Sequence, residues 1–304
     1  MQNTSHILMI RPLAFDYNAQ TAVNNSFQTA SGDVNIHEKA LSEFDNFTAK
    51  LKQHGIHVLM VEDTKEPHTP DSIFPNNWVS FHEDGTVVCY PMFAENRRME
   101  RTKNVLKKIL FKFHYARTID LSHYEEQNLF LEGTGSMVLD REHKIAYACL
   151  SPRTNETVLK DFCEHLGYTP VTFKAFDKQR QAVYHTNVMM SIAKEYAVIC
   201  LDSVPNGVAK NKLTDTLSQT GKTIIPISIE QMQHFAGNML QVQNNQEDPF
   251  IVMSTQAYHS LSRSQIIALQ GYNQIIHVPL YAIEKNGGGS ARCMMAEVFL
   301  PPKR

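Results

Sequence analysis

Cys293 has the sequence surroundings that best fit a chemical nucleophile. It follows the run 287–289 of three glycines, which lets the backbone bend sharply and approach a ligand closely. The thiolate is the reactive form of cysteine, so this residue would need a positive or hydrogen-bonding neighbour. A buried, inert thiol is the commoner role, and it fits the cysteines that lie in apolar runs or on a predicted helix: Cys89, Cys149, Cys163 and Cys200. Because a plain core strand needs no glycine triplet upstream, the sequence favours a functional Cys293.

His185 and Glu132 could complete an acid–base set around this cysteine. His185 lies between Tyr184 and Asn187, and a Cys–His pair generates a thiolate and supplies a general acid for a leaving nitrogen. Glu132 lies in the segment Leu131-Glu132-Gly133, where a charged carboxylate is costly in a core unless it has a partner. The alternatives are a structural histidine and a solvated glutamate.

These residues belong to five polar segments that interrupt otherwise apolar strands. Core strands exclude polar groups unless those groups are satisfied or useful. The segments are 74–78, 131–136, 184–187, 235–238 and 287–293. Their asparagines (Asn77, Asn187 and Asn238) could equally be turn residues, a common role of this side chain.

A repeated pattern of predicted elements explains how such segments could meet. In the first copy, Ala40, Phe44, Phe47 and Leu51 mark one face of a helix, and a glycine and a β-rich run follow. Glycine suits the left-handed position that closes a helix. The closing glycines are Gly55, Gly167, Gly221 and Gly271, separated by 112, 54 and 50 residues. A copy without glycine at 105–110 divides the first gap, so the period is about 50–56 residues.

Two further β-type runs precede each helix, so the unit is strand-strand-helix-strand, used five times. The first strand, 7–10, lacks a predecessor, and the last, 294–300, lacks a helix after it. Pairing these two strands would hide both edges. We therefore expect an α/β fold, a five-bladed α/β propeller closed by its terminal strands, with residues 1–304 as one catalytic domain. A doubly wound sheet is the alternative. Residues 64–71, with two prolines, are expected to form a surface loop.

Composition excludes several classes of function. The 304 residues carry 29 Lys and Arg against 31 Asp and Glu, a formal charge of −2, which argues against a nucleic-acid partner. No apolar run has the roughly 20 residues that a membrane span needs, and the N-terminus lacks a signal peptide. Five scattered cysteines fit a reduced compartment, so we expect a cytoplasmic protein. No cofactor is expected, and no His/Cys cluster has metal-ligand spacing. The sequence is compatible with a homo-oligomer.

The residues resemble the guanidino-group-modifying superfamily, which includes arginine deiminases, dimethylarginine hydrolases and amidinotransferases. The resemblance covers about 7–300 and rests on the loop into Cys293, Glu132-Gly133 and His185-x-Asn187. The sequence is most similar to the citrulline-utilization hydrolase branch, whose markers are 74–78, 235–239 and 287–293. The resemblance implies that Cys293 is the nucleophile, His185 the acid/base and Glu132 the holder of substrate nitrogens. It also implies substrate-binding roles for Phe74, Asn77, Asn187, Arg97, Arg98 and Arg153. The arginines would clamp the substrate carboxylate, Arg153 together with either Arg97 or Arg98.

The chain departs from arginine deiminases at two positions. Those enzymes place aspartates where this chain has Asn77 and Asn187, and the two carboxylates neutralise a guanidinium. A guanidinium buried against neutral amides keeps its charge uncompensated, whereas an amide can donate to a ureido oxygen. We therefore expect a hydrolase of a small amino-acid substrate, citrulline, giving ornithine, ammonia and carbon dioxide. The alternatives are a deiminase, hydrolase or amidinotransferase for arginine or methylated arginine, and a non-catalytic binding propeller.

Overall fold

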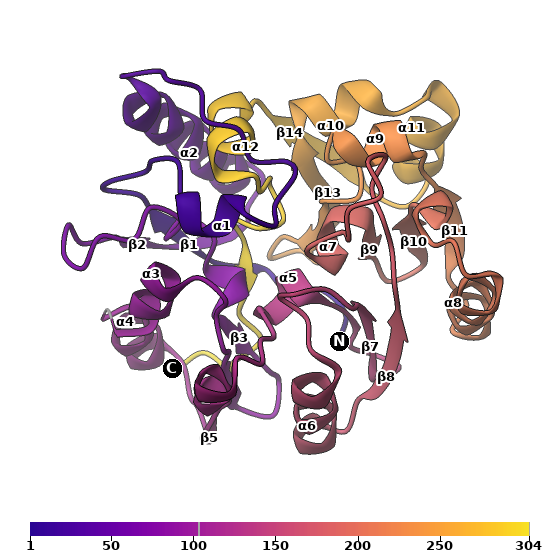
Figure 1. Cartoon of the computed structure of the whole chain (residues 1–304), viewed down its shortest axis with the longest axis horizontal. Helices are drawn as coiled ribbons and strands as arrows, with labels where there is room; N and C mark the ends of the chain where they lie inside the picture. Colours follow the sequence, from indigo (N-terminus) through magenta and orange to yellow (C-terminus); the bar gives the residue numbers. More distant parts are fainter. Residues whose placement is uncertain (103, 304) are drawn as a thin grey trace.

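Five three-stranded sheets arranged in a circle make up the fold (Figure 1). The computed structural model describes residues 1–102 and 104–303. Within these residues, the sheets have the orders β15-β1-β2, β3-β4-β5, β6-β7-β8, β11-β10-β9 and β12-β13-β14. Each sheet is one blade, and the predicted five-bladed α/β propeller is confirmed.

The strands are short, with two to six residues each. They are β1 (His6–Arg11), β2 (His57–Glu62), β3 (Val79–Phe81), β4 (Thr86–Cys89), β5 (Arg117–Asp120), β6 (Met137–Asp140), β7 (Ile145–Cys149), β8 (Thr169–Phe173), β9 (Met190–Ile192), β10 (Tyr196–Ile199), β11 (Thr223–Pro226), β12 (Leu240–Gln243), β13 (Pro249–Ser254), β14 (Gln274–Val278) and β15 (Ala296–Glu297).

The helices connect these strands. They are α1 (Ala19–Ala22), α2 (Ile36–Gln53), α3 (Glu95–Arg98), α4 (Val105–Lys112), α5 (Gly133–Ser136), α6 (Glu156–Leu166), α7 (Thr186–Met189), α8 (Gly207–Gln219), α9 (Ile229–Gln233), α10 (Thr255–Ser260), α11 (Arg263–Gln270) and α12 (Tyr281–Gly287). The 3₁₀ helices of the described residues are η1 (Pro75–Asn77), η2 (Met99–Thr102), η3 (Ser122–Gln127) and η4 (Leu201–Ser203).

Every blade has the same internal pairing. Its middle strand pairs antiparallel with one neighbour and parallel with the other, as β7 does with β6 and β8. The parallel pair requires a crossover, and the helix between those strands supplies it. In Figure 1, α2, α4, α6, α8 and α11 lie around the outside of the circle. The predicted apolar face of α2 is confirmed, because Ala40, Phe44, Phe47 and Leu51 are all fully buried.

Pairing of the two chain ends closes the circle. β1 pairs antiparallel with β15, with Ile7 opposite Glu297 and Leu8 opposite Ala296. The predicted closure is confirmed, but the strand expected over 294–300 is much shorter. Residues 291–294 form a hydrogen-bonded turn instead, because Cys293 N and Met294 N both donate to Ser290 O. This turn lies at the inner end of the blade, where the site described below is built.

Two local expectations are wrong. Gly271 follows α11 with φ −65°, so the left-handed closure found at Gly167 (φ +69°) is not used there. The segment 64–71 is also only partly a surface loop. Its last three residues, Thr69, Pro70 and Asp71, are buried, because the chain turns inward before η1.

Candidate active site

Corresponding turns of the five blades meet at the inner ends of the sheets. Each turn precedes the first strand of a blade: η1 before β3, α5 before β6, α7 before β9, the residues before β12, and the residues before β15. They carry Asn77, Glu132, His185, Asn238 and Cys293 respectively, none more than 3 % exposed. The prediction that polar residues at equivalent points of the repeat converge agrees with this geometry.

Two carboxamides surround the sulfur of Cys293. Its Sγ lies 3.2 Å from Nδ2 of Asn238 and 3.5 Å from Nδ2 of Asn187. Both nitrogens are donors, so they can stabilise negative charge on the sulfur. The glycines upstream are required by packing, because a Cβ at Gly287 would lie 2.8 Å from the Phe74 ring. Phe74 therefore supports the loop that carries Cys293.

Glu132 and His185 form a buried pair beside this sulfur. Nε2 of His185 lies 2.8 Å from Oε2 of Glu132. Although burial opposes its ionisation, Arg153, His185 and Arg97 hold the pKa of Glu132 well below its ordinary value. Burial lowers the pKa of His185, and Glu132 offsets only part of that effect. The pair therefore consists of an ionised carboxylate and a neutral imidazole whose proton lies on Nε2.

Arg153 joins this pair to the segment between β1 and α2. Its Nη1 lies 3.4 Å from Oε2 of Glu132, and its Nε donates to Oδ1 of Asn24 at 2.8 Å. Nη2 of the same guanidinium donates to the backbone oxygen of Thr21. We call residues 12–35 the N-terminal strap. Further along the strap, Nδ2 of Asn25 donates to Gly288 O at 3.2 Å, so the strap bridges Arg153 and the glycine loop.

Arg97 orients Asn77. Its Nη1 donates to Oδ1 of Asn77 at 2.7 Å, and its Nε donates to Glu100 at 2.8 Å. With Oδ1 occupied in this way, Nδ2 of Asn77 has no hydrogen-bond partner although it is buried. An unpaired buried donor is costly, and this one is available to an acceptor atom of a ligand.

Asp71 is a site residue that sequence reasoning missed. Its Oδ2 accepts from Asn18 (2.8 Å) and from Thr21 (3.0 Å) of the strap, while its buried Oδ1 has no partner. Burial raises the pKa of Asp71, and Arg97 opposes this effect. The residue lay in a segment interpreted as surface loop, and only its closeness to the 74–78 motif could have drawn attention to it.

A small cavity lies among these groups. The residues around it include Asp71, Asn77, Arg97, Arg153, Tyr184, His185, the glycines 287–289 and Cys293. Its free space is about 10 Å³, roughly what one water molecule needs. A ligand as large as an amino acid fits only when part of the cavity wall moves, and Thr21 and Asn25 of the strap form one side of that wall. We call this space the catalytic cavity.

Of the two arginines that could join Arg153 as a carboxylate clamp, Arg97 lines the catalytic cavity and Arg98 does not, so the substrate-binding role expected for Arg98 is corrected. Its Nε donates to Met92 O at 3.0 Å, and its side chain lies 3.7 Å from Glu125 and is 26 % exposed. Neighbouring residues of a short helix point in different directions, and on α3 it is Arg97 that points inward. Within the described residues, no group of three or more His, Cys, Asp or Glu could hold a metal ion.

Comparison with known proteins identifies the family. Residues 11–300 match the family model described as N,N dimethylarginine dimethylhydrolase, eukaryotic. The chain belongs to this family. It is thus a member of the guanidino-group-modifying superfamily, as its motifs predicted, and its family is one of hydrolases that act on amidine C–N bonds. No curated protein sequence matches it.

Solved structures share the fold at low identity. The N-terminal domain of ArgZ, an arginine dihydrolase from the ornithine-ammonia cycle in cyanobacteria, was solved as a cysteine-to-serine mutant bound to substrate. It is 19 % identical to this chain, with a TM-score of 0.76 over 97 % of this chain and 98 % of that one. AgrE in complex with L-arginine is also 19 % identical, with a TM-score of 0.76, and the match covers 98 % of this chain and 40 % of that chain.

A dimethylarginine dimethylaminohydrolase adduct with S-methyl-L-thiocitrulline is 16 % identical, with a TM-score of 0.68 over 97 % of this chain and 100 % of that one. These relatives therefore bind arginine or a related amino acid in their structures. Within residues 1–102 and 104–303, every helix of the present chain is too short or too polar to span a lipid bilayer.

Proposed function

We propose that the chain hydrolyses the ureido group of a free α-amino acid, with citrulline as substrate, through a covalent intermediate on Cys293. The observation that carries this proposal is the uncharged surroundings of the sulfur. Its two side-chain donors are the carboxamides of Asn187 and Asn238. The carboxylate of Glu132 is already engaged by His185 and Arg153. A neutral ureido group fits such surroundings better than a guanidinium, whose charge would need a carboxylate beside the sulfur.

The groups farther from the sulfur suit the α-amino acid end of the substrate. Arg153 is a guanidinium that can hold a carboxylate in a bidentate pair, once its bonds to the strap at Thr21 and Asn24 are exchanged for bonds to the ligand. Asp71 offers an unpaired, buried carboxylate oxygen to an α-ammonium group. Together these two residues would recognise a zwitterion.

The reaction would proceed in two steps. His185 takes the thiol proton of Cys293, and the resulting thiolate attacks the ureido carbon. Asn77, Asn187 or Asn238 stabilises the developing oxyanion, an effect worth about 2.7–4 kcal/mol per donor in other enzymes. His185 delivers a proton to the departing nitrogen, then takes one from the water that cleaves the thiocarbamoyl intermediate. The resulting carbamate breaks down, so citrulline and water give ornithine, ammonia and carbon dioxide, and Cys293 is regenerated.

A second candidate is hydrolysis of arginine or a methylated arginine. The family model is described by dimethylarginine hydrolysis, and structural relatives are named as arginine dihydrolases. The unpaired oxygen of Asp71 also offers a negative charge within the catalytic cavity. These findings favour an amidine substrate, whereas the two carboxamides beside the sulfur favour a ureido substrate.

A substrate panel distinguishes the two candidates. Purified protein would be incubated with citrulline, arginine, agmatine and asymmetric dimethylarginine, and ornithine, ammonia and dimethylamine would be measured. We expect ornithine and ammonia from citrulline, and no turnover by Cys293→Ser. Cys163→Ala is the matched control, because Cys163 lies on the outer helix α6, and this variant should turn over citrulline like the wild type. Dimethylamine release without citrulline turnover would establish the second candidate and overturn the first.

A further inference from the structure

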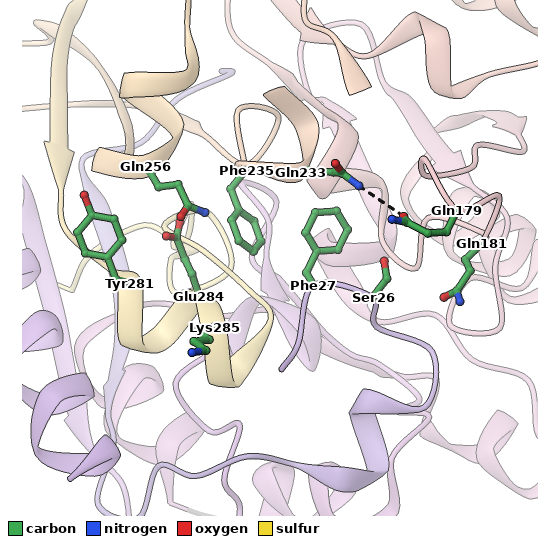
Figure 2. Close-up of a pocket in the computed structure, with 10 residues that line it drawn as sticks. All are labelled: Ser26, Phe27, Gln179, Gln181, Gln233, Phe235, Gln256, Tyr281, Glu284 and Lys285. Carbon is green, nitrogen blue, oxygen red and sulfur yellow. Dashed lines mark hydrogen bonds between the residues drawn. The ribbon is translucent and has the colours of Figure 1, made fainter. Parts of the chain in front are cut away.

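A second, larger cavity lies beyond the strap. Its volume is about 650 Å³, which is within the range of small-molecule sites. Phe27, Phe235, Gln181, Gln256 and Glu284 are among its lining residues (Figure 2). No residue lines both this cavity and the catalytic cavity. We call it the outer cavity.

The outer cavity contains a buried carboxyl group that the proposed mechanism does not use. Glu284 is 2 % exposed, and its Oε2 has no hydrogen-bond partner. Burial raises the pKa of Glu284 to about 7, and the nearby hydroxyls of Ser254 and Ser290 offset only part of that effect. Figure 2 shows Gln256 pointing towards this carboxyl group from α10. A buried carboxylate without a full set of partners is costly, and a cation would remove that cost.

The rest of the wall suits an organic cation with an apolar body. The rings of Phe27 and Phe235 lie 5.2 Å apart, at 45° to one another, and aromatic faces attract ammonium groups and pack against apolar chains. Carboxamides occupy the opposite side, where Nε2 of Gln233 donates to Oε1 of Gln179 at 3.4 Å (Figure 2). The other charged lining residue, Lys285, is exposed at the rim.

Two connections lead from the outer cavity to the catalytic cavity. Phe27 belongs to the strap, and its ring packs edge-on against Tyr184 with 6.0 Å between centroids. Tyr184 lines the catalytic cavity and donates to Gly288 O. Glu284 accepts from Ser290 Oγ at 2.6 Å, and Ser290 O accepts from Cys293 N at 3.0 Å. A ligand that contacts Phe27 and Glu284 would thus touch the strap directly and the loop of the nucleophile through the hydrogen bond between Glu284 and Ser290.

We propose that the outer cavity is a second ligand site, which takes a small organic molecule with a primary ammonium group and an apolar body. The ammonium pairs with Glu284 after Gln256 rotates aside, and the apolar body lies against Phe27 and Phe235. Occupancy holds the strap in the closed position, because Phe27 is then fixed between the ligand and Tyr184.

Calorimetric titration with n-butylamine tests this proposal, with n-butanol as the uncharged control. We expect saturable binding of the amine to the wild-type chain and none of the alcohol. Glu284→Gln preserves the size of the side chain and an acceptor for Ser290, and it should weaken amine binding at least tenfold. Phe27→Leu should weaken it about two- to fivefold, because a smaller side chain replaces the ring against which the apolar body lies and roughly one buried CH₂ of contact is lost.

Asp71→Asn and Glu230→Gln are the matched controls. Asp71 lies in the catalytic cavity, and Glu230 is 63 % exposed beside Lys178, so both variants should bind the amine like the wild type. Weakening by Asp71→Asn but not by Glu284→Gln would place the amine in the catalytic cavity and overturn the proposal. Absence of saturable binding up to about 10 mM would overturn it as well. The measurement is of binding alone, so its outcome is independent of the substrate proposed above.

Discussion

Glu132 lies 2.8 Å from His185, between Oε2 and Nε2, and neither side chain is more than 2 % exposed. The carboxylate fixes the proton of the imidazole on Nε2 and leaves Nδ1 as an acceptor. It would also stabilise the imidazolium that forms when His185 takes a proton. This pair therefore has the geometry of a base and the group that orients it.

Glu132→Gln should lower kcat by about 10²–10⁴-fold, the usual contribution of a positioned acid–base group. The amide keeps the size of the side chain but loses the charge that supports a protonated His185. Steady-state kinetics on the substrate identified by the panel would measure the effect. Because the variant leaves Arg153 without its charge partner, thermal unfolding must show that it is folded.

Glu230→Gln is the control for this change, because Glu230 is exposed and its partners Lys178 and His234 are exposed as well. It should leave kcat unchanged. If kcat of the folded Glu132→Gln protein stayed within about threefold of the wild type, the acid–base role of the pair would be refuted.

Truncation of Arg153 and truncation of Arg98 should change KM by different amounts. Arg153→Ala removes a buried guanidinium of the catalytic cavity, and loss of a buried partner of the substrate carboxylate should raise KM by about 30-fold or more. Arg98→Ala should leave KM within about twofold of the wild type, because Arg98 contacts Met92 O and Glu125 outside the cavity. Equal effects of the two variants would contradict the placement of the clamp.

These two arginines show where prediction from the sequence ends. The propeller could be predicted because its helices and strands repeat with local periodicity, and the site could be placed because each repeat carries a polar turn at the same point. The direction of a side chain on the short helix α3 depends on packing against other blades. Asp71 and Asn24 lie in irregular segments and reach the site through contacts distant in sequence. No local pattern marks such residues.

A double change, Asn77→Asp with Asn187→Asp, tests the charge argument for the substrate. It places one carboxylate beside Arg97, which in the wild type donates to Asn77 at 2.7 Å. The other carboxylate lies beside the sulfur of Cys293. We expect kcat/KM for citrulline to fall by about 10²-fold and arginine turnover to rise, because carboxylates neutralise a guanidinium but repel the thiolate. Both rates would be followed by ornithine and citrulline release.

Asn155→Asp is the matched control for that double change. Asn155 caps α6 by accepting from Thr157 N, and aspartate serves equally well at such a position. Citrulline kinetics that survive the double change intact would show that the carboxamides do not select the substrate.

Glu284 should make the free energy of unfolding fall as the pH rises. Burial raises its pKa from 4.5 to about 7, and Glu43 on α2 adds to the rise. Between these two values the folded protein holds the proton more tightly than the unfolded chain, so stability is lost as the pH rises through about 7. Glu284→Gln removes this loss. In urea unfolding, the free energy of unfolding of the variant should therefore rise relative to that of the wild type, by up to about 3 kcal/mol between pH 4.5 and pH 8. Glu230→Gln should show no such trend, and a gain that shrinks as the pH rises would mean that Glu284 is ionised in the folded protein throughout this range.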